Sequence, residues 1–113
     1  MSIEEYFATG PAHERPIFDA VMHHLDALGP VHVEPVSVGI FFKRVGKFAE
    51  LRPMQRWVAL SFSLSRPVQH PTIHRKVEQW HGRYFHVANL ATPDDFDEEL
   101  AGWLAEAYLT AGD

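Results

Sequence analysis

The chain has 113 residues, a formal net charge of -5 and no cysteine, and 46% of its residues are hydrophobic. A chain of this size can bury one core without crosslinks, and the missing cysteine excludes disulfides, a thiolate nucleophile and cysteine-ligated zinc or iron-sulfur centres. Because the first residues lack a secretory signal and no apolar run is long enough for a membrane span, we expect a cytoplasmic protein with a single domain over residues 1–113.

The charges are segregated along the chain. Residues 1–34 hold six acids and one base, residues 35–90 hold two acids and nine bases, and residues 91–113 hold seven acids and no base. This pattern has two interpretations. Basic strands and loops face acidic helices within one fold, or a basic surface is left exposed for an anionic ligand or nucleic acid.

Two helices are predicted before residue 30. Apolar residues three and four positions apart predict a short amphipathic helix over residues 3–7, which ends before Gly10. A second helix is predicted from Pro16, which suits a first helical turn, to Leu28, where Gly29 follows as a stop signal.

From residue 31 the pattern changes to short extended segments bounded by proline and glycine. Strands are predicted over residues 31–35, 38–43, 48–52, 57–64 and 83–90, with a further extended segment over residues 76–80. A turn at His81-Gly82 joins the last two.

The segment from Trp57 to Leu64 has the clearest strand pattern, because large apolar side chains alternate with small ones. The large ones are Val58, Leu60, Phe62 and Leu64, and the small ones are Ala59, Ser61 and Ser63. We expect the large side chains to face the helices and the small ones to leave space on the other side of the sheet. If that space is open and bordered by arginines, it is where a ligand would lie.

A C-terminal helix is predicted after Thr92, which is a suitable N-cap, with Pro93 in the first turn and Asp95 closing an approximate capping box. Connections between the strands are mostly too short for helical crossovers. The sequence therefore predicts an α+β fold: a largely antiparallel sheet of about five strands, with two N-terminal helices and one C-terminal helix packed mainly on one face.

A family resemblance is carried by segments of the strands, the long loop and the last helix. These segments are Ile40 to Phe42, Phe48 to Pro53, Leu60 to Leu64, His70-Pro71 with Ile73, Lys76 to Glu78, Arg83 to His86, and Pro93 to Leu100 with Trp103-Leu104 and Ala107-Tyr108. In them the chain resembles an uncharacterised bacterial family of small domains, classed only as a domain of unknown function and sometimes labelled as predicted transport proteins. The resemblance implies no established activity.

Four histidines, His70, His74, His81 and His86, cluster in the loop and the strand that follows it, which invites a zinc hypothesis. No pair of them has the supporting pattern of a known metal site, such as two histidines flanking a glutamate on one helix. Neither GxGxxG nor GxxxxGK[ST] occurs in the chain. We therefore assign no metal, no cofactor and no catalytic residue.

The long loop over residues 65–75 is the leading candidate for function, because loops on a rigid sheet carry most binding residues. Our leading hypothesis is a non-enzymatic binding module that accepts an anionic small molecule or an acidic partner segment in a basic groove near this loop. The candidate ligand-binding residues are Arg52, Arg56, Arg75, Arg83 and His86.

Other classes of function remain as alternatives. An enzyme could use a histidine-carboxylate site around His86 and Glu78. Arginines interleaved with aromatic residues suit single-stranded nucleic acid, although an acidic chain is a poor generic binder of it. Dimerisation through an exposed strand edge is a further alternative, and no membrane partner is expected.

Overall fold

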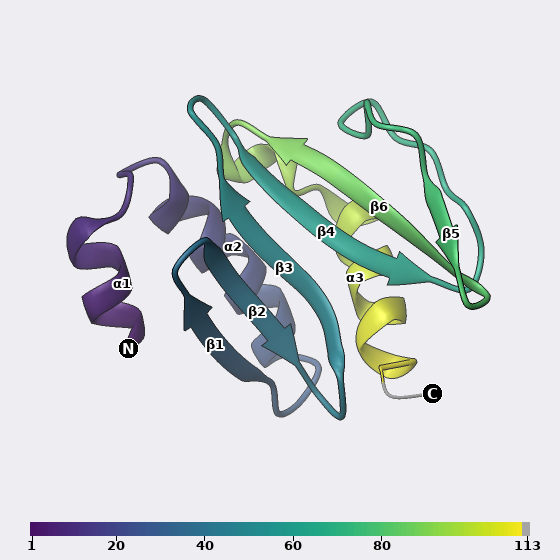
Figure 1. Ribbon diagram of the computed structural model, residues 1–113, viewed down its shortest axis with the longest axis horizontal. Helices are drawn as coiled ribbons and strands as arrows, with labels where there is room; N and C mark the ends of the chain where they lie inside the picture. Colours follow the sequence, from purple (N-terminus) through teal and green to yellow (C-terminus); the bar gives the residue numbers. More distant parts are fainter. Residues whose placement is uncertain (112–113) are drawn as a thin grey trace.

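A computed structural model describes residues 1–111 and shows helices packed against one antiparallel sheet (Figure 1). The helical elements are α1 (Ile3–Thr9), α2 (Glu14–Asp26), a 3-10 turn η1 (Pro93–Asp95) and α3 (Glu98–Leu109). The strands are β1 (His32–Val36), β2 (Gly39–Lys43), β3 (Lys47–Pro53), β4 (Val58–Leu64), β5 (Glu78–Trp80) and β6 (Arg83–Leu90). The predicted α+β class is confirmed.

The sheet has six strands in the order β1-β2-β3-β4-β6-β5, and every neighbouring pair is antiparallel. The sequence predicted about five strands. The sixth is the short edge strand β5, which forms within the extended segment predicted over residues 76–80. The predicted turn at His81-Gly82 is present, with φ of 50° and 75° at its two residues. Positive φ at both central residues is the geometry that a two-residue hairpin requires.

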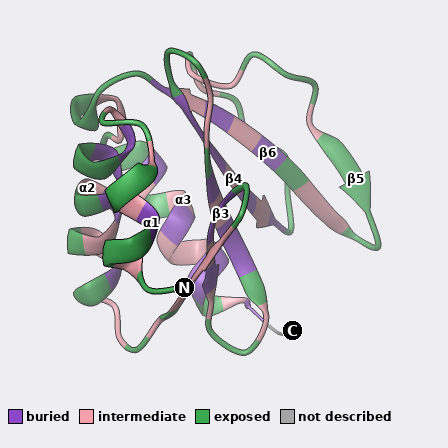
Figure 2. Ribbon diagram, turned by 60° about the vertical axis from the view of Figure 1, so that its left-hand side comes forward, coloured by how far each residue is buried: buried purple, intermediate pink, exposed green. Residues whose placement is uncertain are grey.

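Strand β4 lies between β3 and β6 and forms the middle of the core. Val58, Leu60 and Leu64 are fully buried and Phe62 is 2% exposed, as predicted for the large side chains of this strand. They belong to the same buried cluster as Leu104 of α3 and the apolar side of α2. Figure 2 shows that the buried residues lie where the sheet and the helices face each other.

The C-terminal helix begins later than the sequence predicts. Thr92 and Asp95 do form the expected capping box, but they cap only the single turn η1. The chain then leaves the helical conformation at Phe96, and Asp97 caps α3 by accepting a hydrogen bond from the backbone N–H of Leu100 at 2.9 Å. Two acidic caps in succession therefore divide the predicted helix into a turn and a helix.

Helix α2 begins at Glu14 rather than at Pro16, which places a carboxyl group in the core. Glu14 is fully buried, and neither of its carboxyl oxygens has a hydrogen-bond partner. Burial raises the pKa of Glu14, against smaller opposing effects of the Tyr6 hydroxyl and His13. The core therefore favours the protonated carboxyl.

None of the helices in residues 1–111 combines the length and the apolar character needed to cross a bilayer.

Replacing Glu14 by glutamine should stabilise the protein at pH 8. The pKa of Glu14 is higher in the folded protein than its value of 4.5 in the unfolded chain. The protonated carboxyl therefore contributes its full stabilisation below pH 4.5, and this stabilisation is lost as the pH rises through the folded-state pKa. Glu14→Gln cannot ionise, so its free energy of unfolding should exceed that of the parent by about 1–3 kcal/mol at pH 8 and by less at pH 4. Urea unfolding at both pH values measures the difference. Glu4→Gln, on the exposed side of α1, is the control, and an equal gain at both pH values would contradict the prediction.

Candidate functional site

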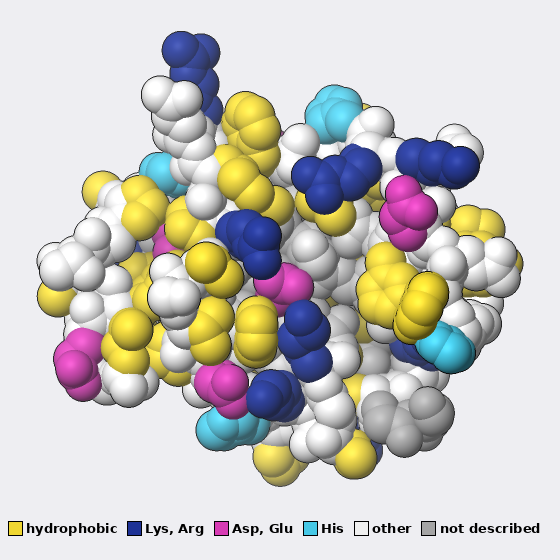
Figure 3. Space-filling view, viewed as in Figure 1, with side chains coloured by type: hydrophobic (Ala, Val, Ile, Leu, Met, Phe, Trp, Pro, Cys, Tyr) yellow, Lys and Arg dark blue, Asp and Glu magenta, His cyan; other side chains and the backbone are white. Residues whose placement is uncertain are grey.

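Helices α2 and α3 lie behind the sheet in Figure 1. The opposite face carries a groove along β4 (Figure 3). Its floor consists of Ala59, Ser61 and Ser63. Their side chains are small, so β4 forms a depression between the larger side chains of β3 and β6. Strand β3 forms one wall, and β6 with the end of the long loop forms the other. We call this the β4 groove and define it by Glu50, Arg52, Met54, Trp57, Ala59, Ser61, Ser63, His74, Arg75, Phe85, Val87 and Asn89.

Three hollows that share lining residues make up the β4 groove. One of about 270 Å³ is lined by Trp57 and Arg75, and one of about 230 Å³ is lined by Arg52 and Arg75. A third, of about 70 Å³, lies beside Phe85. Each is smaller than a typical enclosed site for a small molecule, so the groove suits a group that lies along the strand more than one that is enclosed on all sides.

A larger hollow of about 670 Å³ lies within the long loop and is lined by loop residues alone, from Pro67 to Val77. Its lining includes Arg75, which also borders the β4 groove. We place the candidate site in the β4 groove because its floor is a central strand with the core directly beneath it. A rigid floor loses less entropy on binding than a loop does.

The charges in the groove leave one arginine without a carboxylate partner. Glu50 is 3.0 Å from Lys47 and 3.6 Å from Arg52, so its negative charge is compensated by two cations. Arg75 is exposed and has no carboxylate within 4.0 Å in the described part of the chain. Figure 3 shows basic side chains on both sides of the pale floor. The groove therefore has a net positive charge at its Arg52 and Arg75 end.

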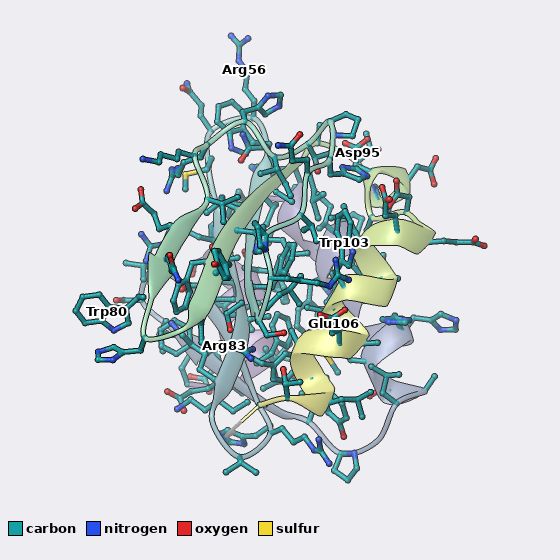
Figure 4. The ribbon with its side chains drawn as sticks, turned by 90° about the vertical axis from the view of Figure 1, so that its right-hand side faces the viewer. Arg56, Trp80, Arg83, Asp95, Trp103 and Glu106 are labelled. Atoms are coloured by element: carbon teal, nitrogen blue, oxygen red, sulfur yellow. The ribbon has the colours of Figure 1, made fainter. Side chains whose placement is uncertain are left out.

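The structure brings together Arg52 and Arg75 of the five candidate residues and places the other three elsewhere. Arg56 lies exposed in the turn between β3 and β4 and points away from the sheet (Figure 4). Arg83 lies at the far end of β6 and does not line the groove, although it touches the last floor residue. It donates to the carbonyl of Ser63 at 3.0 Å, to the hydroxyl of Ser63 at 3.3 Å and to the hydroxyl of Thr110 at 3.1 Å. Its guanidinium thereby joins the sheet to the end of α3.

His86 lies on the helix side of the sheet, away from the groove. It is 1% exposed, its ring stacks on Phe62 at 5.0 Å, and its Nε2 accepts a hydrogen bond from the backbone N–H of Val68 at 3.0 Å. Burial lowers the pKa of His86, which favours the neutral ring. Glu78 pairs with Phe85, the neighbour of His86, and so lies on the opposite face of the sheet. The two side chains do not form an acid-base pair.

His70 fixes the long loop to the start of α3. Its side chain is 6% exposed, and its Nε2 is 2.8 Å from Oδ2 of Asp97, the residue that caps α3. Its Nδ1 accepts from the backbone N–H of Thr72 at 3.1 Å, so Nε2 is the nitrogen that donates to Asp97. Thr72 also accepts from the N–H of Asn89 at 2.9 Å, which holds the loop against β6.

The hydroxyl of Thr72 is 2.8 Å from Nδ1 of His70, which completes a row of hydroxyl, imidazole and carboxylate. Such a row can activate a nucleophile if backbone donors also stabilise the oxyanion. Here the N–H of Thr72 donates to His70, and the N–H of Ile73 donates to the carbonyl of His70 at 2.9 Å. Both nearby donors are used within the loop, so the arrangement acts as a latch.

The four clustered histidines do not converge. Within residues 1–111, no three histidine, aspartate or glutamate side chains lie close enough together to hold a metal ion. His70 and His86 are both engaged in hydrogen bonds, while His74 and His81 are exposed.

Two positions in the groove were not predicted from the sequence. Glu50 and Val87 line it on opposite sides of Ser61, with which each of them pairs. The sequence suggested Glu50 only as an alternative to Glu78 as a carboxylate for His86, which lies on the other face. Side chains alternate along β3, so Glu50 and Arg52 lie on the same face. Once the register of β3 is known, the sequence therefore predicts that Glu50 lines the groove. Val87 gives no such signal, because its position depends on the non-local pairing of β6 with β4.

The fold is a small α+β domain in which, among residues 1–111, the helices lie on the sheet face opposite the β4 groove. The chain belongs to the family described as Domain of unknown function (DUF5655), whose model matches residues 3–111. No curated protein and no solved structure matches the chain.

Replacing His70 by alanine should release the long loop without unfolding the core. The change removes the contacts to Asp97 and Thr72 and should cost about 1–3 kcal/mol of local stability. Trypsin cleavage after Arg75 and Lys76 under native conditions should therefore become faster. His74→Ala, in the same loop but exposed, is the matched control. Equal cleavage rates in the two variants would contradict the role of His70 as a latch.

Proposed function

We propose that this protein is a non-enzymatic binding module whose β4 groove accepts an anionic ligand, either a carboxylate-bearing small molecule or an acidic segment of a partner. The observation that carries this proposal is the position of Arg75. It borders the groove, has no carboxylate within 4.0 Å among residues 1–111, and lines the same hollow of about 230 Å³ as Arg52. Two guanidinium groups beside one hollow suit a carboxylate, because their planar donors match its two oxygens.

The distribution of charge over the molecule supports an anionic partner. The helices and their caps carry most of the acids, while nine of the ten basic residues lie in the strands and loops between residues 35 and 90. Arg66 pairs with Glu106 of α3 at 2.9 Å, and Arg44 donates to the carbonyl of Tyr108 at 3.2 Å. Internal pairing thus uses part of the basic charge, and the remainder at Arg75 faces the open side of the sheet.

Rigidity of the site also favours binding over catalysis. The floor residues belong to the central strand, and the loop that carries Arg75 is fastened by His70 to Asp97 and by Thr72 to Asn89. A preorganised site loses little conformational entropy when a ligand binds.

Single-stranded nucleic acid is the second candidate, and exposed aromatic side chains favour it. Trp57 and Phe85 are 39% and 43% exposed at the two ends of the groove. Bases stack on such rings in many proteins that bind single strands. Lys47 and Arg52 are already paired with Glu50 in the groove, however, which leaves Arg75 as the main contact for a phosphate. A third ring, Phe41, is covered by the ammonium of Lys47 at 4.4 Å.

We further propose that the module works in the bacterial cytoplasm. A chain without cysteine does not depend on an oxidising compartment, and the resemblance described above is to a bacterial family.

Replacing Arg75 by glutamine should weaken anion binding at least about tenfold, because a charged hydrogen-bonding partner of the ligand is lost. Binding of succinate and of hexaglutamate can be followed by amide chemical shifts in titrations at low and high salt. Shifts should appear in β3, β4 and β6, and they should weaken with added salt.

Arg56→Gln is the matched control, because it removes the same charge from the same chain away from the groove. Its affinity should remain within about twofold of the parent, since the charge it removes is exposed and screened. Equal losses in the two variants would show that net charge, not the groove, determines binding. Tighter binding of an oligothymidine than of both carboxylate probes, again lost in Arg75→Gln, would favour nucleic acid instead.

A further inference from the structure

We propose that the occupant of the β4 groove is an extended peptide segment with an acidic residue and a small apolar residue two positions apart. This inference rests on the proposed function and makes it more specific. It follows from the division of the groove into two compartments with different chemistry and a fixed spacing.

The first compartment is the hollow of about 230 Å³ above Ala59 and Ser61, between Arg52 and Arg75. It suits a carboxylate for the reasons given above. The second compartment is the hollow of about 70 Å³ above Ser61 and Ser63, beside the ring of Phe85. Since a water molecule occupies about 30 Å³ of liquid, the second compartment has room for a side chain of at most about three heavy atoms, such as that of alanine, threonine or valine.

The spacing between the compartments comes from β4 itself. Both compartments include Ser61, and they extend from it by one step in opposite directions, to Ala59 and to Ser63. One step of two residues along a strand is about 6.6 Å. An extended peptide lying along the groove repeats its side chains on one face at the same interval. Its residues i and i+2 therefore enter the two compartments together.

The charges beside the small compartment disfavour a continuous run of acids. Lys47 and Glu50 both border this compartment, but they are paired with each other at 3.0 Å. A carboxylate placed there would therefore meet the ring of Phe85 and an ammonium that already has a partner, away from Arg75. A peptide with one acidic residue and a small apolar residue two positions before or after it can fill both compartments. A polyanion has a suitable group only for the compartment between Arg52 and Arg75.

Capped isomeric pentapeptides test this inference directly. Ser-Asp-Ser-Val-Ser and its reverse, Ser-Val-Ser-Asp-Ser, have the proposed spacing, while Ser-Asp-Val-Ser-Ser has the same composition without it. Affinities measured by amide chemical shifts should be about tenfold higher for the better of the two spaced peptides than for the unspaced one. Shifts should include the amides of Ser61, Ser63 and Phe85.

Two variants locate the effect in the small compartment. Ser63→Leu fills it from the floor and Phe85→Ser removes its apolar wall, and each should abolish the preference for the spaced peptides while both kinds still bind. Because the second variant acts on an exposed side chain, it tests the compartment even if Ser63→Leu does not fold. A preference that persists in Phe85→Ser would overturn the assignment of the compartment.

The outcomes separate this inference from the proposed function. If spaced and unspaced peptides bind equally and both are lost in Arg75→Gln, the β4 groove binds anions and the spacing rule is wrong. If no pentapeptide, succinate or hexaglutamate binds at millimolar concentration, the proposed function fails as well. If an oligothymidine binds tightly through Arg75 and the peptides do not, the occupant is a nucleic acid and the peptide inference is overturned.

Discussion

The alternation of large and small side chains along β4 is the constraint on which the rest of the structure depends. Leu60 and Phe62 point into the core and bury a full apolar face against the helices, as the period of a strand requires. The same period places Ala59 and Ser61 on the opposite face, where they cannot fill the space between β3 and β6. One sequence pattern therefore produces both the core and the groove. A one-residue change of register would destroy both together.

The long loop contributes Arg75, which has no carboxylate partner in the part of the chain that the structure describes. Charged residues on strands readily form ion pairs, because neighbouring side chains on one face are only a few ångströms apart. Glu50 pairs with Lys47 and Arg52 in this way. Arg75 comes from the long loop, which His70 attaches to Asp97. Arg75 therefore has no place in the strand register, and it reaches the groove without a neighbouring strand residue opposite it. His70, on the helix side of β6, and Arg75, on the open side, belong to the same loop. Loss of the His70 contact with Asp97 should therefore disturb the position of Arg75.

Local patterns in the sequence predicted most of the fold but only part of the site. Strand periodicity identified β4 and its two faces, because the signal is contained within a few consecutive residues. Two successive caps, Thr92 with Asp95 for η1 and Asp97 for α3, divided the predicted C-terminal helix, since Asp97 accepts from the N–H of Leu100 directly. Arg52 and Arg75 meet in the groove, whereas His86 points to the core. Which residues share a face depends on strand register and loop path, and these are non-local.

The positions of the buried titratable groups are consistent with the proposal that the groove binds a ligand. Enzymes concentrate groups with shifted pKa values in the cleft where chemistry occurs. Here burial raises the pKa of Glu14 and of Tyr6, and it lowers the pKa of His86. Glu14 and Tyr6 lie between α1 and α2 and His86 lies beneath the sheet, so none of the three reaches the β4 groove. Exposed cations and a rigid floor of small side chains remain at the open face, and they suit the recognition of charge and shape more than the transfer of a proton.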